Sequence, residues 1–174
     1  MQATSIQIYT DGSARNNPGR GGYGAILIFG NYTKSIAQGY KHTTNNRMEI
    51  MGVIEALKLI KQKELPITIY SDSRYVVDAI SLGWVNKWLR THFKGDKKNP
   101  DLWLQYSLVA QGLTVTMEWV KGHAENPYNN QCDILATNAA DDRQNLKDDA
   151  GYGNEINTYQ QLMATNKFTT SQLS

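Results

Sequence analysis

The sequence contains little cysteine and no long apolar run, and both absences narrow the class of protein. Cys132 is the only cysteine among 174 residues, which excludes an internal disulfide framework and fits a reducing compartment. No apolar run approaches the roughly 20 residues of a membrane span. Residues 1–5 lack the basic start and apolar stretch of a secretion signal. We therefore expect a cytoplasmic protein without a membrane partner.

An excess of charge of one sign is also absent. The 18 Lys and Arg residues nearly balance the 16 Asp and Glu residues, and the formal net charge of +2 is too small to indicate a partner. The position of the charges therefore carries more information than their sum. The Gly- and Asn-rich loop expected over residues 12–22 lacks the Gly-Lys-Ser/Thr ending of a phosphate-binding P-loop.

Alternating apolar residues bounded by turn signals predict five strands. They cover residues 6–10, 23–29, 34–40, 67–70 and 114–120. Gly30-Asn31 separates the second strand from the third and predicts an antiparallel hairpin. The fourth and fifth strands alternate with helical segments, which favours parallel pairing. The expected fold is α/β, with a mixed five-stranded sheet of three antiparallel strands and two parallel additions, flanked by helices.

Helical periodicity and capping residues predict the helices between these strands. The main ones cover residues 47–61, 74–82, 102–111 and 131–145. After residue 147 the periodicity is weak, and only residues 159–164 suggest a further helix. We therefore expect one domain over residues 1–150 and a polar, mobile tail over residues 151–174.

Four acidic residues stand at the expected ends of these elements. Asp11 and Asp72 end strands, whereas Glu49 and Asp133 begin helices. Each has an ordinary explanation as a turn residue, a helix cap or a partner of the helix dipole. If the strands of Asp11 and Asp72 are neighbours, however, their carboxylates meet and repel one another. Mg²⁺ would relieve this repulsion, and two such ions suit phosphodiester cleavage.

The segment 84–98 combines aromatic and basic residues with a single acid, Asp96. The helical spacing of Trp84 and Trp88 suits packing against a core. The density of cationic side chains instead favours binding to a phosphate backbone. A lone histidine, His123, follows the fifth strand in a loop, where most histidines are simply exposed.

Several short motifs occur together and in one order from about residue 5 to residue 145. They are Tyr9-Thr10-Asp11-Gly12-Ser13, Asn17-Pro18-Gly19 with Gly21-Gly22-Tyr23-Gly24, Thr43-Thr44-Asn45-Asn46-Arg47-Met48-Glu49, Ser71-Asp72-Ser73, Asp101-Leu102-Trp103, Trp119-Val120-Lys121-Gly122-His123 and Cys132-Asp133. The combination resembles a type 1 ribonuclease H of the bacterial kind. The resemblance implies an RNase H-like catalytic domain over residues 1–150.

The resemblance also implies a reaction and a set of site residues. The reaction is endonucleolytic hydrolysis of the RNA strand of RNA–DNA hybrids, which leaves 5′-phosphate and 3′-hydroxyl ends. Asp11, Glu49, Asp72 and Asp133 would bind two Mg²⁺ ions, with Mn²⁺ as an alternative, and His123 would assist proton movement or product release. Independently of the resemblance, one domain without an obvious self-complementary patch suggests a monomer, and we expect no obligate protein partner.

The residues that stand at substrate-contact positions of the family fall into three groups. The implied minor-groove contacts are Asn17, Asn45 and Asn46; the implied DNA-phosphate pocket contains Thr44 and Asn99; and the remaining implied contacts are Arg74, Trp84, Lys87, Phe93, Lys94, Lys97 and Lys98. Trp84 and Phe93 would face deoxyribose. Selectivity for hybrids would come from sensing 2′-hydroxyls on one strand and deoxyribose on the other.

The chain departs from the family pattern at two positions and in one segment, since the basic segment is shorter before Asp101-Leu102-Trp103. Arg74 replaces a glutamine that contacts the RNA strand, and His42 replaces an arginine of the DNA-phosphate pocket. Two rival functions are a hybrid-binding module without catalysis and a nuclease of the same fold that cuts another nucleic acid. The presence of all four acids argues against the first rival. Asn45-Asn46 and the basic segment argue against the second.

Overall fold

A computed structural model describes residues 3–122 and 125–173 of the chain. Its centre is a six-stranded sheet with the order β5-β4-β1-β2-β3-β6. The strands are β1 (Ile6–Ala14), β2 (Gly19–Phe29), β3 (Tyr32–Thr43), β4 (Ile67–Ser71), β5 (Val115–Trp119) and β6 (Leu146–Lys147). The helices are α1 (Asn45–Leu57), α2 (Arg74–Ser81), α3 (Trp84–Arg90), α4 (Pro100–Ala110), α5 (Pro127–Asp141), α6 (Glu155–Asn166) and the 3₁₀ turn η1 (Thr170–Gln172).

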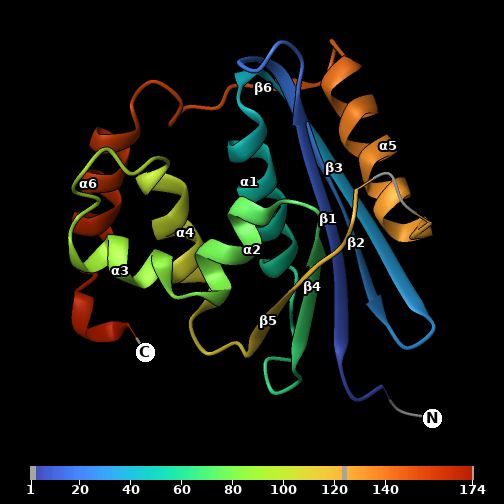
Figure 1. The fold of residues 1–174 in the computed structure, drawn as a ribbon, viewed down its shortest axis with the longest axis horizontal. Coiled ribbons are helices and arrows are strands. Elements are labelled where there is room, and N and C mark those ends of the chain that lie inside the picture. Colours follow the sequence, from blue (N-terminus) through green and yellow to red (C-terminus); the bar gives the residue numbers. More distant parts are fainter. Residues whose placement is uncertain (1–2, 123–124, 174) are drawn as a thin grey trace.

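The helices form layers on the two faces of the sheet. Figure 1 shows α5 on one face, with α1 on the other and α2, α3, α4 and α6 beyond it. The core lies mainly between α1 and the sheet, where Ile8, Ile50, Val53 and Ile69 have no exposed surface. Within the described part of the chain, no helix is long and apolar enough to cross a membrane.

The sheet confirms the predicted mixed topology. The strands β1, β2 and β3 pair antiparallel, whereas β4 pairs parallel with β1 and β5 pairs parallel with β4. The predicted number of five strands is wrong by one, because β6 adds to the far edge, parallel to β3. A strand of two residues is too short to show alternation, which explains why the sequence gives no sign of it.

Two element boundaries near the acids differ from the prediction. Residues 19–22 belong to β2 and not to a loop, and β1 continues to Ala14 because Gly12 and Ser13 still pair with Tyr23 and Gly22. Asp11 therefore lies inside β1 and not at its end. It reaches the sheet edge because the neighbouring strand β4 stops at Ser71.

The helices that carry Glu49 and Asp133 also differ from the prediction. The helix α1 ends at Leu57, because the backbone N–H groups of Leu59 and Ile60 donate to the carbonyl oxygens three residues earlier, at Ala56 and Leu57. The helix α5 begins at Pro127, four residues before the predicted start at residue 131. The side chain of its N-cap, Asn126, accepts hydrogen bonds from the backbone of the first turn.

The C-terminal residues pack against the domain, where the sequence predicts a mobile tail. The helix α6 lies against α4, and it begins earlier and ends later than the predicted residues 159–164. Tyr159 and Phe168 are 5% and 6% exposed and belong to the main core. This segment has few large apolar residues, and their burial depends on partners in α4 and in the connection between α3 and α4 that the local pattern does not reveal.

Candidate active site

The parallel pairing of β1 with β4 places two of the predicted acids opposite each other in adjacent strands. These strands are parallel neighbours, and their register pairs Ile8 with Ile69 and Tyr9 with Tyr70. Counting two residues further along each chain places Asp11 opposite Asp72. The acids therefore meet just beyond the end of β4, as expected if the two strands were neighbours.

Close packing of α1 on β1 adds the third acid. A Cβ atom on Gly12 would overlap the backbone of Met48 and Glu49, so the absence of a side chain lets α1 approach β1 at this point. The first turn of α1 contains no acidic residue, because Glu49 lies in the second turn. Stabilisation of the helix dipole therefore does not explain Glu49.

Asp11, Glu49 and Asp72 form a compact carboxylate cluster. Each offers one oxygen, and these three oxygens lie within 4.8 Å of one another. Asp11 and Glu49 are only 6% and 7% exposed, whereas Asp72 is half-buried. Oxygen ligands at this spacing suit a hard divalent cation.

Asp133 approaches the cluster from the opposite face of the sheet. It lies in the second turn of α5, and the glycine at position 24 permits close packing there, since a Cβ atom would overlap the backbone at Cys132. Asp133 lines a cavity of about 350 Å³ together with the three clustered acids. It is near enough to affect the titration of Asp11, although it lies outside the tight cluster.

Burial and mutual repulsion disfavour ionisation of these carboxyl groups. Burial, and then the charge of Asp72, raise the pKa of Asp11 to about 7. Burial, and then the charge of Asp11, hold the pKa of Glu49 well above its ordinary value. The protein therefore holds acids that gain from neutralisation, either by protons or by a cation.

Unpartnered oxygens support the interpretation of the cavity as a cation site. Glu49 Oε2, Asn129 Oδ1 and Ser13 Oγ are buried, and none has a hydrogen-bond partner among the described residues. All three residues line the cavity of the acids. Buried oxygens normally have partners, so this convergence fits an ion and its water molecules.

Asn129 and Ser13 are site residues that the sequence analysis missed. Asn129 precedes Asp133 by four residues on α5, so both side chains face the same side of the helix. That spacing was a usable signal, but it required the helix to begin at Pro127. Ser13 directly follows Asp11 and Gly12 in the first motif, but the motif alone implies no role for its hydroxyl.

The predicted minor-groove residues lie beside the cavity and are tied to one another. Asn45 and Asn46 line it at the start of α1. The backbone of Asn45 donates to Asn17 Oδ1 at 2.9 Å, and Asn45 Oδ1 accepts from the backbone of Ala14 at 2.6 Å. These hydrogen bonds hold the loop after β1 against the start of α1.

The two residues matched to a DNA-phosphate pocket already have protein partners. Thr44 is the N-cap of α1 and accepts a hydrogen bond from the backbone of Arg47. Asn99 is 8% exposed; its amide donates to the Tyr75 hydroxyl at 3.3 Å and accepts from Arg47 at 3.4 Å. His42, which replaces an arginine of this pocket in the family pattern, is exposed. The centre of its ring lies 5.2 Å from the centre of the Tyr152 ring.

In the basic segment, most of the side chains that are predicted to contact substrate are exposed to solvent. Its surface residues are Trp84, Lys87, Lys94, Lys97 and Lys98. Phe93 is the exception. Its burial corrects the prediction that it faces deoxyribose. Its ring is 5% exposed and packs against Trp88 and Tyr159, so it is a packing residue.

Arg74 is exposed at the start of α2 and points its charge toward the end of β5. Its guanidinium lies 4.0 Å from the centre of the Trp119 ring. This cation–π contact holds the charge close to the last residue of that strand. His123 lies outside the described residues, so its predicted role stays a prediction.

Comparison with known proteins places this site in a family. The RNase H family model matches residues 3–141. The chain belongs to the RNase H family. It is 46% identical over 154 residues to ribonuclease HI of Synechocystis sp., covering 86% of this chain and 95% of that protein. It is 44% identical over 151 residues to ribonuclease H of Syntrophus aciditrophicus, covering 84% of this chain and 86% of the relative.

Solved structures agree with this membership of the RNase H family. The structure of LC9-RNase H1, described as a type 1 RNase H with the type 2 active-site motif, is 28% identical and has a TM-score of 0.71. The match covers 81% of this chain and 74% of that chain. The predictions of an RNase H-like fold and of a hydrolase of this family are therefore confirmed.

Proposed function

We propose that the protein is an endoribonuclease that hydrolyses the RNA strand of RNA–DNA hybrids and leaves 5′-phosphate and 3′-hydroxyl ends. The observation that carries the proposal is the cluster of Asp11, Glu49 and Asp72 at the edge of an RNase H sheet, with oxygens within 4.8 Å of one another. The name ribonuclease H, shared by relatives at 44% and 46% identity, supports the substrate class.

The proposal includes two bound Mg²⁺ ions, with Mn²⁺ as an alternative. Asp11, Glu49, Asp72 and Asp133 would hold them. Bound divalent ions supply Lewis acidity toward a phosphate and make a water molecule a better nucleophile. Asn129 Oδ1 and Ser13 Oγ are placed to accept hydrogen bonds from water in the cavity, which would orient it. His123 would move a proton or speed product release.

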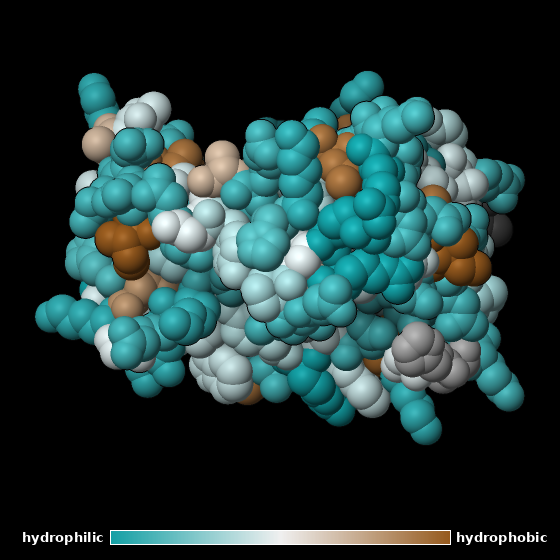
Figure 2. All heavy atoms as spheres, turned by 90° about the horizontal axis from the view of Figure 1, so that it is seen from above, coloured by the Kyte–Doolittle hydropathy of each residue, from teal (hydrophilic) through white to brown (hydrophobic). Residues whose placement is uncertain are grey.

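Residues beside the cavity would select the substrate. Asn17, Asn45 and Asn46 form a polar rim at the site, and polar side chains there suit the 2′-hydroxyls of an RNA strand. Figure 2 looks onto the end of the molecule where β1 ends and α1 begins, and this face is mostly hydrophilic, with small, separate apolar patches. Such a surface suits a polar, charged ligand.

The basic segment would bind the DNA strand. Lys87, Lys94, Lys97 and Lys98 are exposed and carry positive charge, and lysines attract a phosphate backbone in a salt-dependent way. Trp84, which is 39% exposed, would contact deoxyribose. We further propose that the protein acts as a monomer in the cytoplasm, which gel filtration and cell fractionation would test.

A comparison of three duplexes tests the proposal. Hybrid, double-stranded RNA and double-stranded DNA of one sequence are incubated with the protein at fixed Mg²⁺, and the ends of the products are mapped. The expected result is internal cleavage of the RNA strand of the hybrid alone, with 5′-phosphate ends. Cleavage of duplex DNA at a similar rate would contradict the proposed substrate, and binding of hybrid without cleavage would contradict catalysis.

A further inference from the structure

The connection between α3 and α4 has an unusual backbone. Four residues other than glycine adopt the left-handed conformation there, with φ angles of 50° at His92, 56° at Phe93, 58° at Asp96 and 61° at Asn99. This conformation costs free energy for residues with a side chain and persists only where the surroundings fix it. The same connection carries the exposed Lys94, Lys97 and Lys98.

Contacts from α6 fix the first two of these residues. The Tyr159 hydroxyl lies 3.1 Å from His92 Nδ1, within hydrogen-bond distance. The Tyr159 ring meets Phe93 edge to face, with ring centres 5.5 Å apart. Both aromatic side chains are only 5% exposed. On its other side, Phe93 packs against Trp88 of α3, with ring centres 6.2 Å apart.

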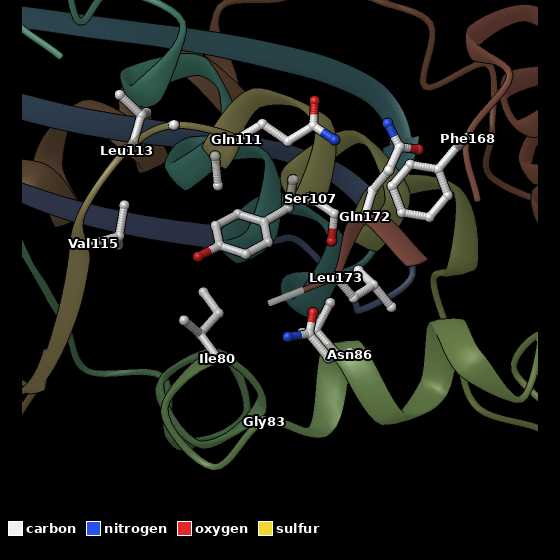
Figure 3. A pocket seen from close by; sticks show the side chains of 14 residues that line it. Ile80, Gly83, Asn86, Ser107, Gln111, Leu113, Val115, Phe168, Gln172 and Leu173 are labelled. Carbon is white, nitrogen blue, oxygen red and sulfur yellow. The ribbon is translucent and has the colours of Figure 1, made fainter. Parts of the chain in front are cut away.

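The helix α6 is itself anchored to the elements that flank the connection. It packs along α4, next to the chain that leads from α3 to α4 (Figure 1). The residues after α6 then return toward α3. Figure 3 shows Phe168, Gln172 and Leu173 around a cavity of about 600 Å³ that is also lined by Ser107 of α4 and Asn86 of α3.

We propose that α6 is a brace that holds residues 91–98 in the conformation that presents Lys94, Lys97 and Lys98 to the substrate. Tyr159 is the positioning residue of this brace and does not itself touch substrate. The inference rests on the proposed function, because it assumes that these lysines bind a hybrid. The helix α6 itself lies outside residues 3–141, which the family model matches.

Trypsin tests the brace without any nucleic acid, because it cleaves after lysine and reports how often the connection opens. The variant Y159L removes the ring contact and the hydroxyl, and Y159F removes the hydroxyl alone. The control is Q160A, at an exposed neighbouring position on α6. Cleavage at Lys94, Lys97 and Lys98 should be roughly tenfold faster in Y159L than in wild type and unchanged in Q160A.

Circular dichroism and thermal melting show whether Y159L is folded and can be compared with wild type. If Y159L is folded, cleavage at the three lysines no faster than in wild type overturns the brace. If Y159L is unfolded, Y159F decides by the same criterion: faster cleavage confined to these lysines supports the brace, and a wild-type rate overturns it.

Hybrid binding then tests the consequence for the substrate. Affinity is measured with EDTA present, and initial rates with Mg²⁺, for wild type and the folded Tyr159 variant. The variant should show a higher Kd and KM with unchanged kcat. The slope of log Kd against log salt should fall by about 1–3, corresponding to one to three lost phosphate contacts. Faster trypsin cleavage with an unchanged salt slope would overturn the role of the brace in presenting the lysines.

The two measurements separate this inference from the proposed function. If the wild-type protein does not bind hybrid at all, the proposed function fails, whereas the trypsin result still shows whether α6 braces the connection. If wild type binds and cleaves hybrid but trypsin cleavage is insensitive to Tyr159, the brace alone fails.

Discussion

Asn129 and Asp133 lie one helical turn apart on α5, and both line the cavity that contains Asp11 and Glu49. Asn129 is 2% exposed, yet its Oδ1 has no hydrogen-bond partner among the residues that the structure describes. A buried amide oxygen without a partner costs free energy. A water molecule held by a cation in the cavity would relieve this cost, so Asn129 belongs with the four acids.

Replacement of Asn129 should weaken Mg²⁺ binding without unfolding the protein. Groups that orient metal ligands or their waters typically contribute 10- to 100-fold in affinity or activity. We expect N129A to need roughly tenfold more Mg²⁺ for half-maximal cleavage and to bind the ion more weakly in calorimetry. The matched control is N138A, at an exposed position of the same helix. Equal Mg²⁺ affinity in N129A and N138A would remove Asn129 from the site.

The raised pKa of Asp11 predicts how stability changes with pH. Burial and the charge of Asp72 raise this pKa from 3.8 to about 7, so between these values the folded state binds more protons than the unfolded state. The resulting stabilisation is complete below pH 4 and is lost as the pH rises through 7. In EDTA, the difference in Tm between D11N and wild type should therefore grow from pH 5 to pH 8, in favour of D11N.

The expected growth of this difference is roughly 6–12 °C, since the interval from pH 5 to the Asp11 pKa of about 7 corresponds to about 3 kcal/mol, and about 1 kcal/mol changes the Tm of a domain of this size by roughly 2–4 °C. Mg²⁺ at pH 8 should raise the Tm of wild type and have little effect on D11N, because the ion binds the folded acids. The control is D148N, at an exposed carboxylate. A Tm difference between D11N and wild type that is independent of pH would show that Asp11 ionises normally.

Asp149 should matter far more to stability than its neighbour Asp148. Asp149 accepts hydrogen bonds of 2.7 and 2.9 Å from the guanidinium of Arg47, which is 1% exposed and also bonds Asp101. Asp148 forms an exposed ion pair with Lys41, at 3.5 Å. Removing one partner of a buried ion pair leaves an uncompensated charge, whereas exposed pairs contribute little.

We therefore expect D149A to lower the free energy of unfolding by about 3–5 kcal/mol and D148A by about 0–1 kcal/mol. Urea unfolding at pH 7 measures both. Because Asp149 also accepts from Thr43 at the end of β3, its loss should loosen the start of α1 next to Asn45. Equal stability of the two variants would show that the buried cluster contributes nothing beyond a surface pair.

The acids could be predicted from the sequence because each one stands in a strong local pattern. The alternation around Ile6 and Ile8 gave β1, and a similar pattern before Asp72 gave β4. Their adjacency did not follow from any local pattern, because β2, β3 and α1 separate the two strands along the chain, and only the parallel pairing of β1 with β4 establishes it. The order of the motifs supplied the rest of the fold.

The features that escaped prediction depend on contacts between distant segments. Phe93 resembles an exposed aromatic in a basic segment, but it is buried between Trp88 and Tyr159, which lies 66 residues later in the chain. The two-residue strand β6 exists because β3 offers it an edge. The start of α5 depends on the cap formed by Asn126 and not on apolar periodicity. Such features become visible only when the chain is folded.

The most direct measurement of the central claim is hydrolysis of an RNA–DNA hybrid in Mg²⁺ by D11N and D72N, compared with wild type and D148N. Asp11 on β1 lies opposite Asp72, which directly follows β4, and both belong to the carboxylate cluster with Glu49. Both variants should keep the wild-type circular dichroism and lose at least about 10³-fold in kcat, a loss of roughly 4 kcal/mol in transition-state stabilisation. D148N should retain full activity. Undiminished Mg²⁺-dependent cleavage by folded D11N would contradict the account.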